Sequence, residues 1–404
     1  MEKKEFRLFF TGILSGIALI MLLMLILLFT GRADFSLLLT GNSNNYAMEK
    51  EIKKKTDIIK RYIDRYYLDE IDSETMADSV YKGIVGGLGD TYAAYYTSDE
   101  YKEITEKSSG TYCGIGAYVS TDQETGNIVI VKPMEDGPAE QAGLKAGDII
   151  YYVNDENVSG QDLTTVLSKV KGEAGTTVNL KIWRKGENGY LDIQVTRSLI
   201  EEDTVSSKML AGNTGYIKVT GFEEVTSKQF ENAVDTLEKN GMKALIIDLR
   251  DNGGGLLTST VKMLDRLLPK GLLVYTKDKE GIAEEYYAED DKCVKVPMAI
   301  LVNEHSASAS EVFSGALQDE GVAKLVGTQT FGKGIVQTIF NLEDGTALKM
   351  TTSKYYTPKG RNIHKTGLAP DIEVELDSNT LAKEGEEFAI DNQMQAALDY
   401  FGSK

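Results

Sequence analysis

The C-terminal half of the chain contains a serine and a lysine that could act together in nucleophilic catalysis. Ser308 lies in a run of small residues between an apolar stretch typical of a strand, 298–302, and a stretch typical of a helix. A sharp turn between a strand and a helix exposes a hydroxyl group and leaves backbone amides free at the helix start. Lys333 and Gln337 follow in one segment, and in a strand they would point to the same face. The amide of Gln337 could then hold the amine of Lys333.

A lysine can serve as a general base only when it is uncharged. A free lysine has a pKa near 10.4, so at pH 7 only about one in two thousand is neutral. Lowering that pKa by about three units corresponds to roughly 4 kcal/mol in favour of the neutral form. Burial among apolar residues can supply this preference, and Phe331, Ile335 and Val336 lie close to Lys333 in the sequence. The pattern predicts a Ser–Lys pair that needs no metal and no organic cofactor.

The chain offers little for a mechanism that depends on histidine. It contains two histidines, His305 and His364. His305 is too close to Ser308 in sequence to reach back over its hydroxyl group. His364 lies in a loop rich in Gly, Arg and Asn, where it could line a cleft. Two histidines without a partner motif also make a poor metal site, so no metal site is predicted.

A second group of residues favours the binding of a peptide carboxylate. Gly114, Ile115, Gly116 and Ala117 precede a strand-like run, and glycines allow successive backbone N–H groups to converge on one anion. An extended peptide could pair with the neighbouring strand edge while an apolar pocket takes its last side chain. The glycines of the longer motif 137–150 are interpreted as turn residues that serve folding.

These motifs resemble two known families. The segment 114–150, with the pattern Gly-Pro-Ala-x-x-Ala-Gly-Leu-x-x-Gly-Asp-x-Ile, resembles PDZ domains. Four further motifs resemble the carboxyl-terminal processing proteases, also called tail-specific proteases: Leu-Arg-Asp-Asn-Gly-Gly-Gly at 249–255, Ser-Ala-Ser-Ala-Ser-Glu at 306–311, Phe-Gly-Lys-Gly-Ile-Val-Gln at 331–337 and Tyr-Tyr-Thr-Pro-Lys-Gly-Arg at 355–361. This resemblance implies that Ser308 is the nucleophile, Lys333 the general base and Gln337 the group that positions the lysine.

The resemblance also implies an oxyanion hole and a reaction. The backbone amides of Gly254 and Ala309 would form the hole. The sequence alone does not distinguish Gly254 from its neighbour Gly253 in this role. The implied enzyme is a serine endopeptidase that captures protein C-termini with its PDZ domain and hydrolyses peptide bonds through an acyl-enzyme. Binding of a tail could reposition the PDZ domain and open the active site.

The N-terminus is expected to anchor the protein in a membrane. The run 9–29 is almost entirely apolar, and a helix over this run would match a hydrocarbon core of about 30 Å. Lys3, Lys4 and Arg7 precede it, which favours a cytoplasmic N-terminus. A cleaved signal peptide is the alternative, but the run is long for one and no Ala-x-Ala pattern follows it. We therefore predict a single-pass protein of the cell membrane whose catalytic part is extracytoplasmic.

The rest of the sequence predicts an α/β (α+β) multidomain protein. Helical spacing of apolar residues gives way to short strands divided by glycines, and then to alternating strands and helices. In chain order, the predicted parts are a cytoplasmic N-terminus (1–8), a transmembrane anchor (9–29), a linker (30–45), an N-terminal helical region (46–105), a PDZ domain of β-sandwich or barrel-like form (106–198), a Ser–Lys protease core (199–375) and a C-terminal helical region (376–404).

Composition limits the partners of the protein. The 404 residues carry a formal net charge of −18, whereas nucleic-acid-binding proteins normally present a basic face, so that class is not expected. Cys113 and Cys293 are interpreted as unpaired thiols, although an oxidising compartment would allow a disulfide. The expected partners are proteins or peptides with accessible C-termini, the membrane, and a second copy of the chain in a homodimer.

Two other functions remain open: a tethered PDZ protein with an inactive protease-like domain, and a thioester enzyme that uses the turn 253–255 as its oxyanion hole.

Overall fold

The computed structural model describes residues 43–122, 125–281, 284–380 and 389–402. The chain divides into two compact units, Met1–Ala77 and Asp78–Lys404. The predicted membrane segment, 9–29, lies outside the described residues. Within the described ranges, no helix is both long enough and apolar enough to span a bilayer.

The described part of the first unit is helical. It contains α3 (Ser43–Tyr66) and the first residues of α4 (Ser73–Gly86). The predicted three- and four-residue spacing is present in α3, but Ile52, Ile59 and Tyr62 are 54%, 49% and 63% exposed. These side chains leave a largely unburied apolar stripe along the helix.

The second unit begins with the rest of α4, followed by β1 (Ala94–Tyr96) and α5 (Ser98–Ser109). The predicted helical region over 46–105 is interrupted by one short strand, β1. The strand forms because it pairs in antiparallel register with β18 (Ala347–Tyr356), a partner more than two hundred residues away that local periodicity cannot reveal. Helix α5 begins with a capping box between Thr97 and Glu100.

Two antiparallel sheets follow between Thr111 and Glu201. Their elements are β2 (Thr111–Gly114), β3 (Ala117–Thr121), β4 (Ile128–Pro133), α6 (Pro138–Gln141), β5 (Ile149–Val153), β6 (Glu156–Asn157), α7 (Leu163–Val170), β7 (Thr177–Trp183), β8 (Tyr190–Thr196) and β9 (Ser198–Glu201). The larger sheet has the order β3-β4-β5-β7-β8, with β6 paired to β5, and β2 pairs with β9. Inward-facing apolar side chains, including Ile130, Val166 and Leu180, form one core. The alternating burial of β7 matches the predicted strand at 178–183.

A six-stranded sheet forms the centre of the C-terminal part. It has the order β10-β11-β12-β15-β16-β19, and all of its neighbours pair in parallel except β10 and β11. The strands are β10 (Val205–Leu210), β11 (Thr214–Val219), β12 (Ala244–Asp248), β15 (Met298–Val302), β16 (Ala323–Gly327) and β19 (Ile372–Glu373). Strands β12 and β15 are buried along their whole length, as expected for parallel strands covered on both faces. The predicted alternation of strands and helices is confirmed here.

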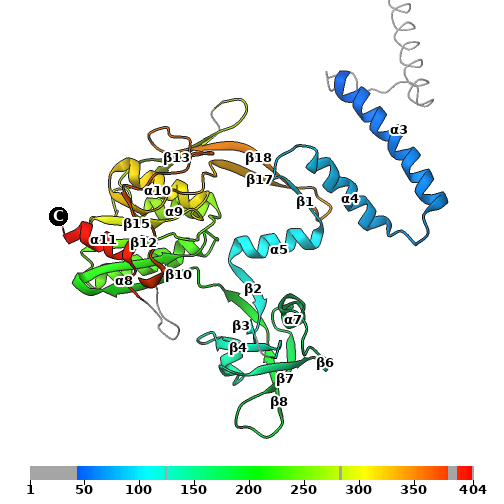
Figure 1. Ribbon diagram of the computed structural model, residues 1–404, viewed down its shortest axis with the longest axis horizontal. Coiled ribbons are helices and arrows are strands. Elements are labelled where there is room, and N and C mark those ends of the chain that lie inside the picture. Colours follow the sequence, from blue (N-terminus) through cyan, green and yellow to red (C-terminus); the bar gives the residue numbers. More distant parts are fainter. Residues whose placement is uncertain (1–42, 123–124, 282–283, 381–388, 403–404) are drawn as a thin grey trace, which may run out of the picture. The chain divides into compact units, whose positions relative to one another are not determined.

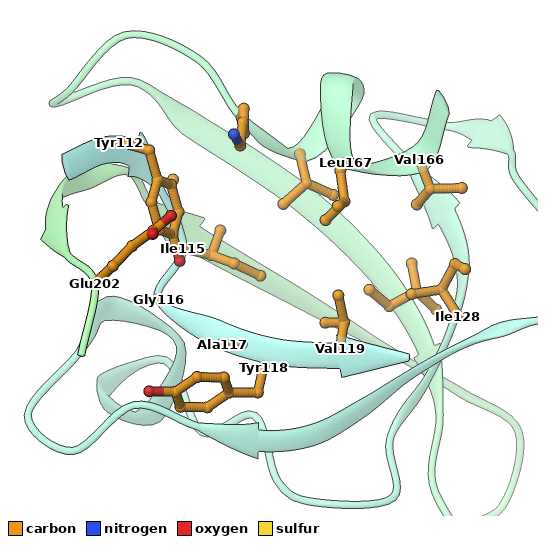
Figure 2. A pocket seen from close by; sticks show the side chains of 14 residues that line it. Tyr112, Ile115, Gly116, Ala117, Tyr118, Val119, Ile128, Val166, Leu167 and Glu202 are labelled. Atoms are coloured by element: carbon orange, nitrogen blue, oxygen red, sulfur yellow. The ribbon is translucent and has the colours of Figure 1, made fainter. Parts of the chain in front are cut away.

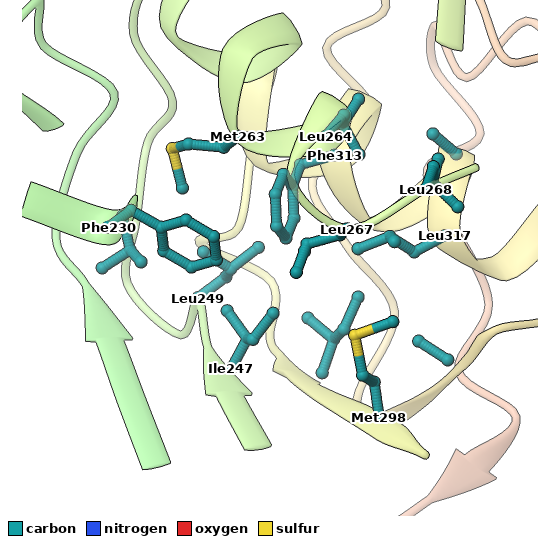
Figure 3. Packing of buried hydrophobic residues seen from close by; sticks show 14 of the residues in the cluster. Phe230, Ile247, Leu249, Met263, Leu264, Leu267, Leu268, Met298, Phe313 and Leu317 are labelled. Carbon is teal, nitrogen blue, oxygen red and sulfur yellow. The ribbon is translucent and has the colours of Figure 1, made fainter. Parts of the chain in front are cut away.

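Helices cover both faces of this sheet (Figure 1). Helices α8 (Thr226–Lys239), α9 (Leu257–Asp265) and α10 (Ala309–Glu320) pack on one face, and α11 (Asn392–Gly402) packs on the other. Figure 3 shows the first interface, where Phe230 and Phe313 meet above Ile247. Their rings lie 6.2 Å apart in an edge-to-face arrangement. The sheet is therefore a platform buried between two helical layers.

A second sheet lies beside this platform in the same unit. It joins β13 (Gly271–Lys277), β14 (Glu284–Ala288), β17 (Ile335–Asn341), β18 and β1 in antiparallel pairs. Strand β17 pairs with β18 along its length, and a bulge separates Val336 from Gln337.

The C-terminal helix is tied to the loop that follows β12. The guanidinium of Arg250 binds both carboxylate oxygens of Asp248 and also donates to Asp391 and Gln393, just before and within α11. Burial of this cluster is offset by its four charge-assisted contacts. The helix that covers the sheet thus also holds the loop. Both cysteines are free thiols.

Candidate active site

Three successive parallel strands deliver the predicted catalytic segments to one edge of the sheet. The loops after β12, β15 and β16 carry Gly254, Ser308 and Lys333, respectively. Because β12, β15 and β16 are neighbours and parallel, their carboxyl ends meet, which is where open α/β sheets place ligands. The fold therefore brings together residues that are far apart in sequence.

Ser308 occupies a strained turn between β15 and α10. Its backbone has φ of 55°, which is rare for a residue other than glycine. Asn252 supports this turn, because its backbone carbonyl oxygen accepts hydrogen bonds from the N–H of Ala307 at 3.1 Å and from the hydroxyl of Ser310 at 2.9 Å. Strain of this kind persists only where the surroundings determine the backbone, and it is characteristic of a nucleophile held at a sharp strand-to-helix turn.

Gly254 lies directly against this turn. A Cβ atom at position 254 would come within 2.7 Å of the Ala307 carbonyl oxygen and 2.9 Å of the Ala309 nitrogen. With its φ of 101°, the site therefore admits only glycine without displacement of the nucleophile turn.

The predicted oxyanion donors differ in their present bonding. The N–H of Ala309 has no acceptor among the described residues. The N–H of Gly254 donates to Asn252 Oδ1 at 2.8 Å, whereas the N–H of the neighbouring Gly253 has no acceptor in the described part of the chain. Gly254 would have to exchange or share this bond in order to bind an oxyanion, so the roles of Gly253 and Gly254 stay predictions.

Glycines also determine the position of the Lys333 loop. A Cβ atom at Gly334 would lie 2.4 Å from the His364 nitrogen, and one at Gly332 would lie 3.1 Å from the Gly367 nitrogen. The loop is fastened by main-chain bonds from Phe331 to Ser306 and from Lys365 to Gly332. The glycines on both sides of the lysine therefore permit close packing against the 363–367 segment.

Glu311 connects the nucleophile turn to the lysine loop. Its carboxylate is fully buried, and its Oε2 atom accepts the backbone N–H of Ser308 at 3.0 Å and that of Lys333 at 2.8 Å. Its Oε1 atom accepts the N–H of Gly332 at 2.8 Å and the hydroxyl of Thr330 at 2.6 Å. Four donors on one buried carboxylate fix both loops with strong bonds. Sequence reasoning included Glu311 in a motif but assigned it no role.

The amine of Lys333 is half-buried. It lies over the ring of Tyr92, 4.6 Å from the ring centroid. Burial, with the nearby charge of Lys349, lowers the pKa of Lys333, and the carboxylate of Asp90 opposes this shift. The direction is the one that a lysine base requires. No hydrogen bond joins Lys333 Nζ to Ser308 Oγ within the described residues.

Gln337 does not contact Lys333 as its predicted positioning role would require. The strand begins only at Ile335, and the bulge before Gln337 breaks the alternation on which the shared-face argument depended. The side-chain amide of Gln337 instead donates to the carbonyl of Ile335 at 3.4 Å and to Thr351 Oγ1 at 3.5 Å. Its role stays a prediction.

The two histidines lie outside the Ser–Lys pair. His305 is exposed and lies 3.8 Å from Glu304. His364 lines a cavity of about 580 Å³ with Tyr92 and Phe331, which confirms the expectation that it faces a cleft. Burial and two neighbouring lysines, Lys365 and Lys354, lower the pKa of His364.

A separate apolar pocket lies between β3 and α7. It has a volume of about 270 Å³ and is lined by Ile115, Val119 and Leu167, among others, as Figure 2 shows. The predicted carboxylate loop, Gly114 to Ala117, forms part of its wall. The backbone carbonyls of Ile115 and Gly116 accept hydrogen bonds from the N–H groups of Ala139 and Met134, respectively. The N–H groups of Ile115 and Gly116 themselves have no acceptor among the described residues. Free amides at one end of an apolar pocket suit a peptide C-terminus.

A strained serine, free amides and a desolvated lysine at one sheet edge define a site of the serine-hydrolase class, here combined with a peptide-binding module. The family model of PDZ domains matches residues 129–184, and that of peptidase family S41 matches residues 213–374.

Known proteins resemble most of the chain. The carboxy-terminal processing protease CtpA of Bacillus subtilis is 34% identical over 380 residues, which cover 93% of this chain and 78% of the relative. A probable CtpA-like serine protease of Staphylococcus saprophyticus is 38% identical over 335 residues, or 82% of this chain and 67% of the relative. Among solved structures, a photosystem II D1 C-terminal processing protease has 29% identity and a TM-score of 0.47, covering 80% of this chain and 87% of its own.

The chain belongs to peptidase family S41 and is a serine-type carboxyl-terminal processing protease with a PDZ domain. Its substrates are proteins. Because the chain belongs to this family, the hypothesis of a thioester enzyme is rejected.

Proposed function

We propose that this protein is a membrane-anchored, extracytoplasmic endopeptidase that captures protein C-termini in its PDZ pocket and cleaves peptide bonds with Ser308 and Lys333. The observation that supports it most is the single Glu311 oxygen that accepts the backbone N–H groups of both residues. Two loops fastened to one buried atom have a defined separation, which proton transfer between their side chains requires.

In this mechanism, neutral Lys333 takes the proton of the Ser308 hydroxyl as its oxygen attacks the carbonyl carbon of the scissile bond. The free N–H of Ala309, together with Gly254 or Gly253, stabilises the oxyanion. Lysine then gives its proton to the departing amine, which leaves an acyl-enzyme on Ser308. A water molecule, deprotonated by the amine of Lys333, then hydrolyses the ester of the acyl-enzyme.

Cleavage by purified variants tests the pair. Ser308→Ala and Lys333→Ala are each expected to reduce hydrolysis of a protein substrate by about a thousandfold or more. His305→Ala, at an exposed residue beside the nucleophile loop, is the matched control and is expected to retain activity. The mechanism is falsified if either pair variant cleaves at the wild-type rate.

The membrane anchor is part of the proposal because of the apolar run 9–29 and the basic residues before it. The full chain is expected in the membrane fraction, with its C-terminal part digested by a protease added outside the cytoplasm. Digestion only after the membrane is broken would contradict the proposed orientation.

Tail capture is the proposed first step of the reaction, and it would reposition the PDZ domain to open the active site. Two substrates that differ only in a free apolar C-terminus or an amidated one test this step. The free tail is expected to be cleaved faster, since only it offers a carboxylate to the amides of Ile115 and Gly116. Equal rates would contradict regulation by tails.

The exposed stripe on α3 supports a homodimer. Ile52, Ile59 and Tyr62 would be covered by a second copy of the helix. Light scattering is expected to give twice the chain mass for the wild type, and the chain mass after Ile52→Glu and Ile59→Glu are combined. A wild-type monomer would contradict this part of the proposal.

A further inference from the structure

The turn 89–92 places an aromatic ring against the amine of Lys333. Tyr92 comes from the segment between α4 and β1, in a region that the sequence motifs left without a chemical role. Its ring centroid lies 4.6 Å from Lys333 Nζ, well inside the range in which the ring face attracts an ammonium group. The amine makes no hydrogen bond within the described residues, so its protonated form is favoured by this ring, in direct contact, and by the nearby charge of Asp90.

The ring is held in place by Asp90. One carboxylate oxygen of Asp90 accepts the N–H of Tyr92 at 2.9 Å, and the other accepts the N–H of Thr351 at 3.3 Å. Thr351 belongs to β18, the partner of the strand that follows Lys333. The turn is therefore fastened to the same sheet that supports the lysine loop, and the position of the ring relative to that loop is defined.

The residue Tyr92 also lines a space large enough for a bound peptide segment. Tyr92 and Asp90 line the cavity of about 580 Å³ together with Phe331, Ile335 and His364. A substrate segment in this cavity would lie next to the ring and would exclude water from it.

We infer that Tyr92 is a positioning residue for the general base: its ring holds the protonated amine of Lys333 in the peptide-free enzyme, and the amine loses a proton to solvent and leaves this contact before it takes the proton of Ser308. The inference deepens the proposed function and rests on it. The ring attracts the ammonium form more than the neutral amine, so it opposes the deprotonation on which catalysis depends.

Other charges act on the same amine and set the background against which the ring acts. Asp90 favours the charged form, and Lys349 of β18 disfavours it. Lys354, Lys365 and His364 line the adjoining cavity, and the Glu311 carboxylate accepts the backbone N–H of Lys333. All of these groups stay in place when the ring alone is replaced.

Replacement of Tyr92 by leucine separates the attraction of the ring from its bulk. The pH profile of kcat/KM is expected to keep its plateau within about twofold while its midpoint falls by about half a unit to one unit. Below the midpoint, kcat/KM then rises about three- to tenfold. Tyr92→Phe keeps the ring face and is expected to keep the wild-type midpoint.

Two further variants complete the test. Asp90→Asn removes the charge but keeps an acceptor for the turn, and it is expected to lower the midpoint as well. Tyr96→Leu is the matched control, because it removes a ring that lies over Lys349 at 5.2 Å and not over Lys333. It is expected to leave the midpoint unchanged.

A second readout does not depend on cleavage. The rate at which acetic anhydride labels Lys333, measured by mass spectrometry across pH, gives the midpoint of its deprotonation in every variant. If the labelling and cleavage midpoints differ in the wild type, Lys333 is not the base and the proposed function fails. If the two midpoints coincide in the wild type but Tyr92→Leu and Asp90→Asn shift neither midpoint, only the role of Tyr92 is overturned. The same conclusion follows if Tyr92→Phe shifts the midpoints as far as Tyr92→Leu does.

Discussion

The PDZ pocket and the Ser–Lys site are built in different ways. The pocket is an open groove of apolar side chains, such as Val119 and Leu167, with a few free amides at one end. The Ser–Lys site depends on main-chain positions that are fixed by one buried carboxylate, that of Glu311, and by glycines that tolerate no Cβ atom.

This difference implies two kinds of response to substitution. Apolar contacts add up in small increments, so the pocket should lose affinity gradually as its wall is trimmed. A buried carboxylate with four donors is a cooperative element, and removal of its charge affects both loops together. Capture of a tail should therefore be adjustable, whereas cleavage should be close to all or none.

The largest effect is expected from Glu311→Gln. A glutamine in this place has only one oxygen and presents an NH2 group to N–H donors, so at least two of the four bonds are lost. We expect unfolding to become easier by about 3 kcal/mol and cleavage to fall by at least about a hundredfold. Chemical denaturation and peptidase assays measure the two effects.

Glu320→Gln, at an exposed residue at the end of the same helix, is the control for that change. It should alter neither quantity. If Glu311→Gln proved as active and as stable as the control, the all-or-none character of the catalytic site would be disproved.

A smaller effect is expected from Asp391→Asn, which weakens the link from Arg250 to the C-terminal helix. Loss of one charged partner of a buried guanidinium should cost about 2 kcal/mol of stability. Since Arg250 adjoins the loop that carries Gly254, kcat should also fall about three- to tenfold, with little change in KM. Thermal unfolding and steady-state kinetics provide the measurements, with Asp399→Asn on the exposed side of α11 as control. A loss of stability without any loss of kcat would show that the contact between Arg250 and Asp391 does not influence the active site.

The smallest effect is expected in the pocket. Leu167→Ala removes part of its apolar wall and should raise KM for a substrate with an apolar tail about fivefold, which corresponds to about 1 kcal/mol. The value of kcat should stay within about twofold. Leu199→Ala, at a residue that is 62% exposed, serves as the control. A fall in kcat that equals the rise in KM would remove the contrast between the two regions.

Local patterns predicted the parallel core and the PDZ strands well, because buried strands such as β12 and β15 carry continuous apolar runs and the helices have regular spacing. Motifs also singled out Gly254, Ser308 and Lys333, which the fold brings to one edge, although Lys333 lies in a loop and not in the strand that was considered for it.

Contacts between distant segments could not be predicted in this way. The pairing of β1 with β18, the ring of Tyr92 beside Lys333 and the bonds of Glu311 depend on how whole elements pack. A single bulge was enough to change the expected relation between Lys333 and Gln337. Residues 9–29 lie outside the described ranges, so the anchor stays a prediction.

The central claim is that Lys333 activates Ser308, and the most direct test is the rate at which a fluorophosphonate probe labels Ser308 as pH is varied. Because burial lowers the pKa of Lys333 and only the neutral amine accepts a proton, the wild-type rate should rise with pH to a plateau, with a midpoint below the 10.4 of free lysine. In Lys333→Met the rate should be at least about a hundredfold lower, without that midpoint. Labelling of Ser308 with the same rate and the same pH profile in both proteins would contradict the account.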